Sequence, residues 1–337
     1  MVSHGLLLSR AATRPQRAIG YIAGHLGGLG VALFFAISGY LITTLLLEEH
    51  DLWGRISLRG FYMRRGFRIL PPAYLYLLVV AIAEPLRHGE LASAALFYSN
   101  YWAERSWYTA HFWSLSMEEH FYLFWPALLG GLGVRRALIA ATVLVAATAW
   151  WRPWSLAHMS LPYPALQRTD MRLDAFLFAC ALAILLHGPY RVALLRVLTM
   201  AWFRILSGVG LIAAWTWTLV ASEPSTGTLV ESALLPCLLI SVIAWQGSGV
   251  FRILESAPLR WMGRISYGLY LWQQLFLAPG FGATILARIA LTFGAAALSY
   301  YLLERPLLHY GRAFSRRIRT RDREALPEMN PSSIMEQ

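Results

Sequence analysis

The sequence predicts an all-α fold, a polytopic membrane helix bundle with about nine transmembrane helices. Of the residues, 57% are hydrophobic and only 14% are charged, and the mean hydropathy is +0.49. This excess of apolar residues is more than the core of a soluble domain can bury. The apolar residues also fall into runs suited to crossing the bilayer core, which takes roughly 17–25 residues of helix for about 30 Å of hydrocarbon.

Nine apolar runs, in chain order, are the expected spans. A further apolar run at residues 92–102 is too short to cross the membrane. We expect it to be re-entrant or interfacial. The nine spans lie near residues 28–47, 71–85, 113–132, 136–151, 172–187, 204–221, 229–247, 265–279 and 282–303.

The basic residues indicate the orientation of these spans. All 29 are arginine, and most lie in connections on one side of the predicted bundle, at residues 55–68, 135–136, 191–196, 252–264 and 312–323. The positive-inside rule makes that side cytoplasmic, which predicts a multi-pass protein of the plasma (inner) membrane with a cytoplasmic C-terminus. The net charge of +11 then follows from topology and attraction to an anionic membrane face, without nucleic acid as a partner.

The chain divides into a membrane domain and a tail. Residues 1–310 hold the spans, and the apolar stub at residues 1–8 is expected to be the outer end of a truncated first helix. Restoring that helix raises the expected number to about ten. Residues 311–337 are basic and then contain proline and serine, so they are expected to form a disordered cytoplasmic tail.

Neither cysteine suggests a disulfide or a metal site. Cys180 and Cys237 both lie within predicted spans, without the short ligand spacing of a metal cluster. We expect each to be a small buried hydrophobic residue and expect no metal.

Glu118 and Glu119 are the most informative residues, because two adjacent carboxylates stand in a segment otherwise built for lipid. A charge at the centre of a membrane helix costs roughly 2.5–3.5 kcal/mol on insertion scales, so it is kept where it is paired, hydrated or functional. His111 lies seven residues before Glu118, and so on nearly the same helix face if the helix begins that early. The competing interpretation is a capping box, with Ser116 as the N-cap and Glu119 three residues later.

Arg64, Arg65 and Arg68 form the second candidate group, on the predicted cytoplasmic side just before Pro71. Guanidinium groups bind phosphates in a bidentate manner, so this cluster could hold a phosphorylated cosubstrate. The alternative is that the three arginines only enforce the membrane topology.

Five segments together resemble the acyltransferase-3 family of membrane O-acyltransferases. They occur in the family's order and span about residues 25–310: 34–42 (FFAISGYLI), 64–71 (RRGFRILP), 111–126 (HFWSLSMEEHFYLFWP), 265–272 (ISYGLYLW) and 304–306 (ERP). The resemblance implies transfer of an acyl group, most commonly acetyl, from acyl-CoA to a hydroxyl of a carbohydrate or glycosylated acceptor. It implies acyl-CoA as a co-substrate rather than a bound cofactor, and it gives no oligomeric state.

The resemblance also assigns expected roles to residues. It implies that His4 is the catalytic base. Glu118 and Glu119 are the other expected catalytic residues, one of them orienting the histidine or binding the acceptor hydroxyl. His25 is the alternative histidine. The resemblance implies that Arg64, Arg65 and Arg68 bind the donor. In the family's pattern a histidine often stands where this chain has Gln273. The expected acceptor-binding residues are His111, Trp113, Tyr122, Arg172 and Tyr267.

Two questions stay open at this stage. Arg172 and Asp174 match an Arg-x-Asp pattern of the family, but an ion pair that fixes helix packing explains them equally well. The competing function is a transporter or flippase of a glycolipid or other anionic small molecule. A non-catalytic member of the family is the third possibility.

Overall fold

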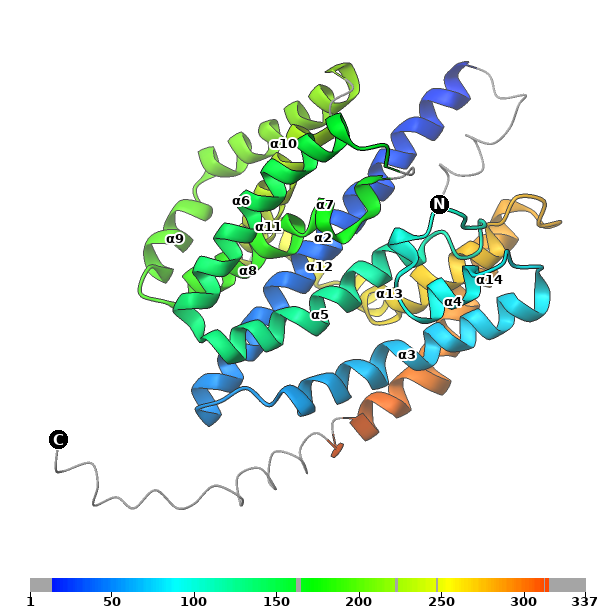
Figure 1. The fold of residues 1–337 in the computed structure, drawn as a ribbon, viewed down its shortest axis with the longest axis horizontal. Helices are drawn as coiled ribbons and strands as arrows, with labels where there is room; N and C mark the ends of the chain where they lie inside the picture. Colours follow the sequence, from blue (N-terminus) through cyan, green and yellow to red (C-terminus); the bar gives the residue numbers. More distant parts are fainter. Residues whose placement is uncertain (1–13, 162–164, 222–223, 247, 312, 315–337) are drawn as a thin grey trace.

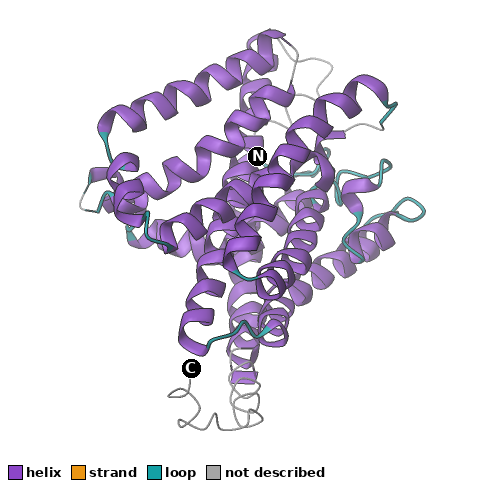
Figure 2. Cartoon of the chain, turned by 60° about the vertical axis from the view of Figure 1, so that its left-hand side comes forward, coloured by secondary structure: helices purple, strands orange, loops and turns teal. Residues whose placement is uncertain are grey.

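The computed structural model describes residues 14–161, 165–221, 224–246, 248–311 and 313–314, with side chains from residue 27 onward except Leu219. This part consists of helices and the loops that connect them, with no strand (Figure 2). The all-α prediction is therefore confirmed. The longer helices are α2 (Arg14–Trp53), α3 (Leu58–Ala83), α5 (Phe112–Leu132), α6 (Val134–His158), α8 (Asp174–His187), α10 (Ala201–Ala221), α11 (Pro224–Ala244), α13 (Ala257–Phe276) and α14 (Ile285–Leu298).

Short helices connect them. They are α4 (Glu90–Ala95), η1 (Ser99–Tyr101), η2 (Ala165–Gln167), α7 (Thr169–Arg172), α9 (Arg191–Leu198) and α12 (Gly249–Leu254). Helix α14 continues through a π-helical turn, η3 (Ser299–Glu304), and the chain stays helical as far as Gly311. The predicted tail from residue 315 onward lies outside the described residues.

When helices are counted by length and composition alone, the number of candidate spans is smaller than the predicted nine. Among the described residues, five helices are long and apolar enough to cross a membrane, or six if α9 and α10, which are bent by 68°, form one span. The other three predicted spans are helices α5, α8 and α13. Helix α8 is too short at 14 residues, whereas α5 and α13 have sufficient length and fall outside the set because they are more polar.

Helix α3 starts earlier than the predicted span at residues 71–85. It begins after Ser57, whose side chain accepts a hydrogen bond from the Gly60 N–H, and it continues through Pro71 and Pro72. Serine is a favourable N-cap because its oxygen satisfies one of the free N–H groups of the first turn. All three arginines of the cluster therefore lie within the helix, on a rigid element.

Residues 92–102 form only short helices, neither of them long enough to cross a bilayer. The buried Glu90 organises this region by accepting hydrogen bonds from the backbone N–H of Arg87 at 3.0 Å and of Ser106 at 2.8 Å, and from the hydroxyls of Ser106 and Thr109. Burial opposes ionisation, but these hydrogen bonds outweigh it and lower the pKa of the Glu90 carboxyl. The ionised carboxylate thus closes the loop that leads into α5.

Helix α2 runs diagonally through the middle of the molecule and packs against α8, α11 and α5 (Figure 1). Its approach to α8 is close at Gly39, where an added Cβ would lie 2.4 Å from the Phe176 carbonyl oxygen. Helix α3 packs against α5, α13 and η3. Helices α2, α3, α5 and α13 therefore meet around one region of the core.

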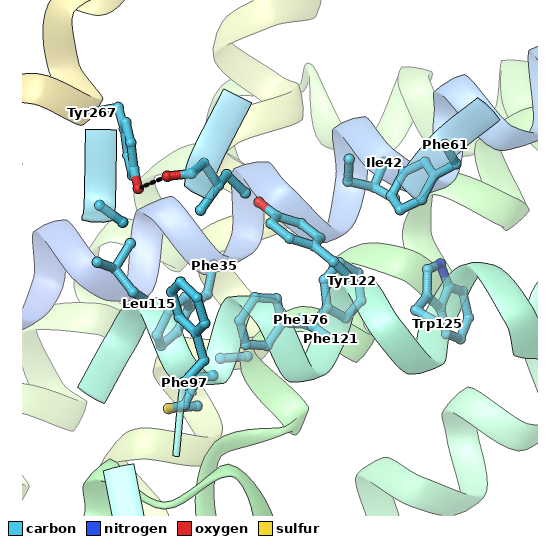
Figure 3. Close-up of a cluster of buried hydrophobic side chains, with 14 of the residues drawn as sticks. Phe35, Ile42, Phe61, Phe97, Leu115, Phe121, Tyr122, Trp125, Phe176 and Tyr267 are labelled. Carbon is cyan, nitrogen blue, oxygen red and sulfur yellow. Dashed lines mark hydrogen bonds between the residues drawn. The ribbon is translucent and has the colours of Figure 1, made fainter. Parts of the chain in front are cut away.

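Stacked aromatic rings fill the core beside that region (Figure 3). The ring centroid of Phe176 lies 4.4 Å from that of Phe35 and 4.6 Å from that of Phe121. Beside them, the indole N–H of Trp125 donates to the Thr43 hydroxyl at 2.8 Å, which fixes α5 against α2. These contacts set the register of α2 against α5, and hence the relative position of the polar residues that the two helices carry.

Candidate active site

Glu118 is the centre of the candidate site. Its side chain is buried, and one carboxylate oxygen accepts hydrogen bonds from the Ser38 hydroxyl at 2.6 Å and from the Tyr122 hydroxyl at 2.8 Å. The two hydroxyl oxygens are 3.2 Å apart. A buried carboxylate that accepts a short hydrogen bond from a hydroxyl group is placed to take the proton of that hydroxyl.

The capping-box interpretation of this segment is wrong. Helix α5 begins at Phe112, so Ser116 and Glu119 both lie inside it, and the Ser116 hydroxyl donates back to the Phe112 carbonyl at 2.9 Å. Helix α5 begins directly after His111, which is the early start that the alternative interpretation required. Glu118 and Tyr122 are then one helical turn apart, which allows their direct hydrogen bond.

Two arginines of α3 flank the carboxylates. The guanidinium of Arg65 lies 4.7 Å from the centroid of the Tyr122 ring and interacts electrostatically with Glu118 and Glu119. Arg68 interacts electrostatically with Glu118 and with the buried Glu304. Positive charge therefore compensates these acids in the interior, as intramembrane charges require.

Arg64 is turned towards a different partner. Its guanidinium forms an ion pair with the buried Glu49 at 3.0 Å, and Glu49 also accepts the Ser57 N–H at 3.1 Å. A cavity of about 50 Å³ lies here between α2 and α3. Its wall combines apolar side chains with charged ones: Ile42, Leu45, Leu46, Glu49, Phe61, Arg64 and Arg65.

Tyr267 of α13 completes the group from the other side. Its hydroxyl donates to the Ile69 carbonyl of α3 at 2.9 Å, and it interacts electrostatically with Glu119 and Glu304. Figure 3 shows the Tyr122 and Tyr267 hydroxyls on the same side of the stacked rings. The structure thus brings together Glu118, Glu119, Tyr122, Arg65, Arg68 and Tyr267, which the sequence had suggested separately.

His111 lies at the start of α5, in a box of aromatic rings. Its ring centroid is 5.2 Å from that of Tyr76 and 5.4 Å from that of Tyr270, and both ring nitrogens are buried without a hydrogen-bond partner. The Tyr270 hydroxyl donates to the His111 carbonyl at 2.9 Å. Trp113 instead packs edge-on against Phe35, at 6.1 Å between ring centroids, so it supports the core.

Arg172 and Asp174 belong to two separate ion pairs. Asp174 pairs with Arg152 of α6 at 2.6 Å, and both side chains are fully buried. Arg172 pairs with Glu231 of α11 at 3.7 Å. In the described part of the chain these contacts join α6, α7, α8 and α11, and the structure does not bring Arg172 to Glu118.

Ser38 and Glu304 were missed as individual residues, although both stand in segments that carry the family resemblance. Glu304 ends the π-helical turn η3 and accepts a hydrogen bond from Ser299 at 3.1 Å. A lone acid at the end of an apolar run gives the same signal as Glu118 and could have been found by it. Serine in an apolar helix gives no such signal, because it usually bonds to its own backbone.

The expected base His4 lies outside the described residues. The alternative, His25, falls within the backbone of α2, but its side chain lies outside the described part. No group of three or more His, Cys, Asp or Glu among the described residues could hold a metal ion. The described site therefore consists of carboxylates, hydroxyls and guanidinium groups.

Comparison with curated proteins finds proteins named as O-acetyltransferases. The chain is 28% identical to the peptidoglycan O-acetyltransferase OatA of Listeria monocytogenes over 347 aligned positions, which cover 88% of this chain and 55% of that protein. It is 30% identical to a Bacillus subtilis protein named "Putative peptidoglycan O-acetyltransferase YrhL", over 87% of this chain and 52% of the relative. The chain thus spans about half the length of these curated relatives.

No solved structure matches the chain. The family model described as an acyltransferase domain matches residues 4–304, nearly the whole of the chain. That range includes four of the five segments on which the resemblance was based, together with Glu304, the first residue of the fifth. The chain belongs to the acyltransferase-3 family.

Proposed function

We propose that this protein is a membrane O-acyltransferase that moves an acyl group from acyl-CoA to a hydroxyl of a carbohydrate acceptor, with acetyl as the first candidate for the acyl group. The observation that carries the proposal is the buried Glu118 carboxylate, which holds two hydroxyl groups at 2.6 and 2.8 Å and has Arg65 beside it. Acyl transfer to an alcohol needs a base for the hydroxyl proton and positive charge or hydrogen-bond donors for the oxyanion. These are the groups present at this site.

The chemistry balances with these groups. The acceptor oxygen attacks the thioester carbon while a carboxylate or histidine takes the hydroxyl proton. The carbon–sulfur bond then breaks, and the proton passes to the departing CoA thiolate. The guanidinium of Arg65 stands next to the carboxylates, where charge changes during the reaction, and it serves to stabilise the developing oxyanion.

The donor is proposed to enter beside Arg64 and Arg65, which line the cavity between α2 and α3. Guanidinium groups suit the phosphates of CoA, and the apolar part of the wall suits its pantetheine arm. The arginine-rich end of α3 would then face the cytoplasm. His4, which lies outside the described residues, is proposed as the second base. Peptidoglycan fragments are the first acceptors to test, because relatives are named for that substrate.

The test is release of CoA thiol by the purified protein given acetyl-CoA and a panel of peptidoglycan fragments and other saccharides. Glu118→Gln keeps the shape of the side chain but removes the base, so acceptor-dependent release should fall by at least about 10²-fold. Glu48→Gln, at an exposed glutamate of the same helix as Ser38, is the matched control and should retain activity.

Two further results would separate the alternatives. Loss of release in His4→Ala but not in His25→Ala would support the expected base. No thiol release with any donor or acceptor, from protein that elutes as a single folded species, would contradict the proposed reaction and favour transport of a glycolipid.

A further inference from the structure

Ser38 has an unusual set of contacts for a serine within an apolar helix. Serine and threonine in such helices ordinarily bond to the carbonyl one turn earlier. Thr43 of the same helix does so, donating to the Gly39 carbonyl at 2.7 Å. The Ser38 hydroxyl instead reaches across to α5 and donates to the Glu118 carboxylate at 2.6 Å, in a position only 6% exposed.

This contact is the arrangement of an activated nucleophile. A hydroxyl becomes nucleophilic when a neighbouring base takes its proton and when a further group holds that base in place. Glu118 is the base within reach, and the Tyr122 hydroxyl bonds to the same carboxylate oxygen at 2.8 Å, which orients it. The guanidinium of Arg65 over the Tyr122 ring adds positive charge close by.

The backbone around Ser38 is held firmly. Gly39 lets α2 approach α8 so closely that any side chain there would meet the Phe176 carbonyl. The next turn of α2 is joined to α5 by the bond from Trp125 to Thr43. Ser38 is therefore presented to Glu118 from a fixed helix rather than a loop, as precise catalytic positioning requires.

We propose that Ser38 carries the acyl group covalently, as an ester on its hydroxyl oxygen, between the donor and the acceptor. This inference rests on the proposed function and changes its route: the acyl group passes through an acyl-enzyme, in place of direct attack of the acceptor on the thioester. In the first half-reaction the Ser38 oxygen bonds to the thioester carbon, its proton moves to Glu118, the carbon–sulfur bond breaks, and the proton leaves with the CoA thiolate. In the second half-reaction the acceptor oxygen bonds to the same carbon, its proton moves to Glu118 and then to the Ser38 oxygen as the ester bond breaks.

The experiment is single-turnover labelling with radioactive acetyl-CoA in the absence of acceptor, followed by a denaturing acid quench. The expected result is close to one acetyl group per wild-type chain, formed at a rate at least equal to turnover. Peptide mass analysis should place it on the segment 34–42, and hydroxylamine at alkaline pH should remove it. Addition of acceptor before the quench should discharge it.

Three variants make the result specific. Ser38→Ala should lose the label and reduce turnover by at least about 10³-fold. Ser38→Cys should still be labelled, but as a thioester that hydroxylamine cleaves at neutral pH. Ser116→Ala removes another fully buried serine, whose hydroxyl donates to the Phe112 carbonyl of its own helix, and should leave labelling and turnover unchanged.

The outcomes separate this inference from the function on which it rests. Acceptor-dependent CoA release by wild-type protein without any covalent label would overturn the acyl-enzyme and leave the acyltransferase intact. The same conclusion follows if Ser38→Ala keeps the label or keeps normal turnover. If the wild-type protein neither releases CoA nor becomes labelled, the proposed reaction itself has failed.

Discussion

The buried ion pair between Arg152 and Asp174 allows a quantitative test of what holds the helices together. Arg152 is fully buried, and its guanidinium binds the Asp174 carboxylate at 2.6 Å, the Met171 carbonyl at 2.6 Å and the Ser225 carbonyl at 3.0 Å. One side chain of α6 therefore connects three other segments of the bundle. The perturbation is Arg152→Met, which keeps an apolar chain of similar length and removes the charge.

The expected loss is large because Asp174 is left buried and uncompensated. Removing one partner of a buried pair costs about 3–5 kcal/mol. At roughly 2 °C per kcal/mol for a large chain, the melting temperature should fall by about 6–10 °C. The double variant Arg152→Met with Asp174→Leu removes both charges, so its melting temperature should lie between those of the wild type and the single variant.

The assay is thermal unfolding in detergent, followed by size-exclusion elution at each temperature. Arg196→Met, at an exposed arginine of α9, is the control and should shift the melting temperature little. The reasoning is refuted if Arg152→Met behaves like Arg196→Met. It is also refuted if the effects of the two substitutions simply add, because contacting residues should show a coupling of up to about 3 kcal/mol.

Two further predictions concern the loop before α5 and the centre of α2. Because hydrogen bonds lower the pKa of the buried Glu90, its contribution to stability is complete above the usual glutamate pKa and is lost as the pH falls through the lowered value. Glu90→Gln should therefore reduce the melting temperature near pH 7 and weaken its dependence on pH below about 4.3, the usual glutamate value, as a thermal scan across acidic pH would measure. An equal pH dependence in both proteins would contradict this. Gly39→Ala should destabilise the protein by about 1–3 kcal/mol and abolish acyl transfer, since the added Cβ would meet the Phe176 carbonyl. Gly30→Ala, at a position where the space is open, is the control and should change neither stability nor activity. Equal thermal stability and activity of the two variants would show that the close helix approach is unimportant.

The sequence predicted the helix of the candidate site because charge in an apolar segment is costly, and Glu118 was identified for that reason. Arg65 was identified because clustered guanidinium groups bind phosphates. The structure places Glu118 and Arg65 together, where their charges compensate. Ser38 carries no charge and stands in an ordinary apolar run, so only its position opposite α5 distinguishes it. A pairing across two helices depends on which faces pack, and that information lies in the assembled bundle.

The lack of information about helix packing and helix ends also explains the predictions that differ from the structure. A capping-box pattern at Ser116 is also compatible with a helix interior, and the true start of α5 at Phe112 decided between them. The partner of Asp174 could not be predicted because Arg152 stands on another helix, twenty-two positions away in the printed sequence. The predicted spans at α5 and α13 were located as helices, yet their polarity, which comes with the site residues, removes them from the set that composition alone supports.

The π-helical turn at Ser299–Glu304 makes the winding of one helical turn a determinant of the candidate site. A π-helix holds more residues in a turn than an α-helix, and such turns often occur at functional sites. If this turn became α-helical with the number of residues unchanged, everything that follows it would rotate by about 100°, the angle between successive residues of an α-helix. Glu304 would then leave the side of the helix that interacts with Arg68, although every contacting residue type would still be encoded. In the divergence of such chains, a substitution that removes the π-helical turn thus changes the content of the candidate site without changing any of its residues.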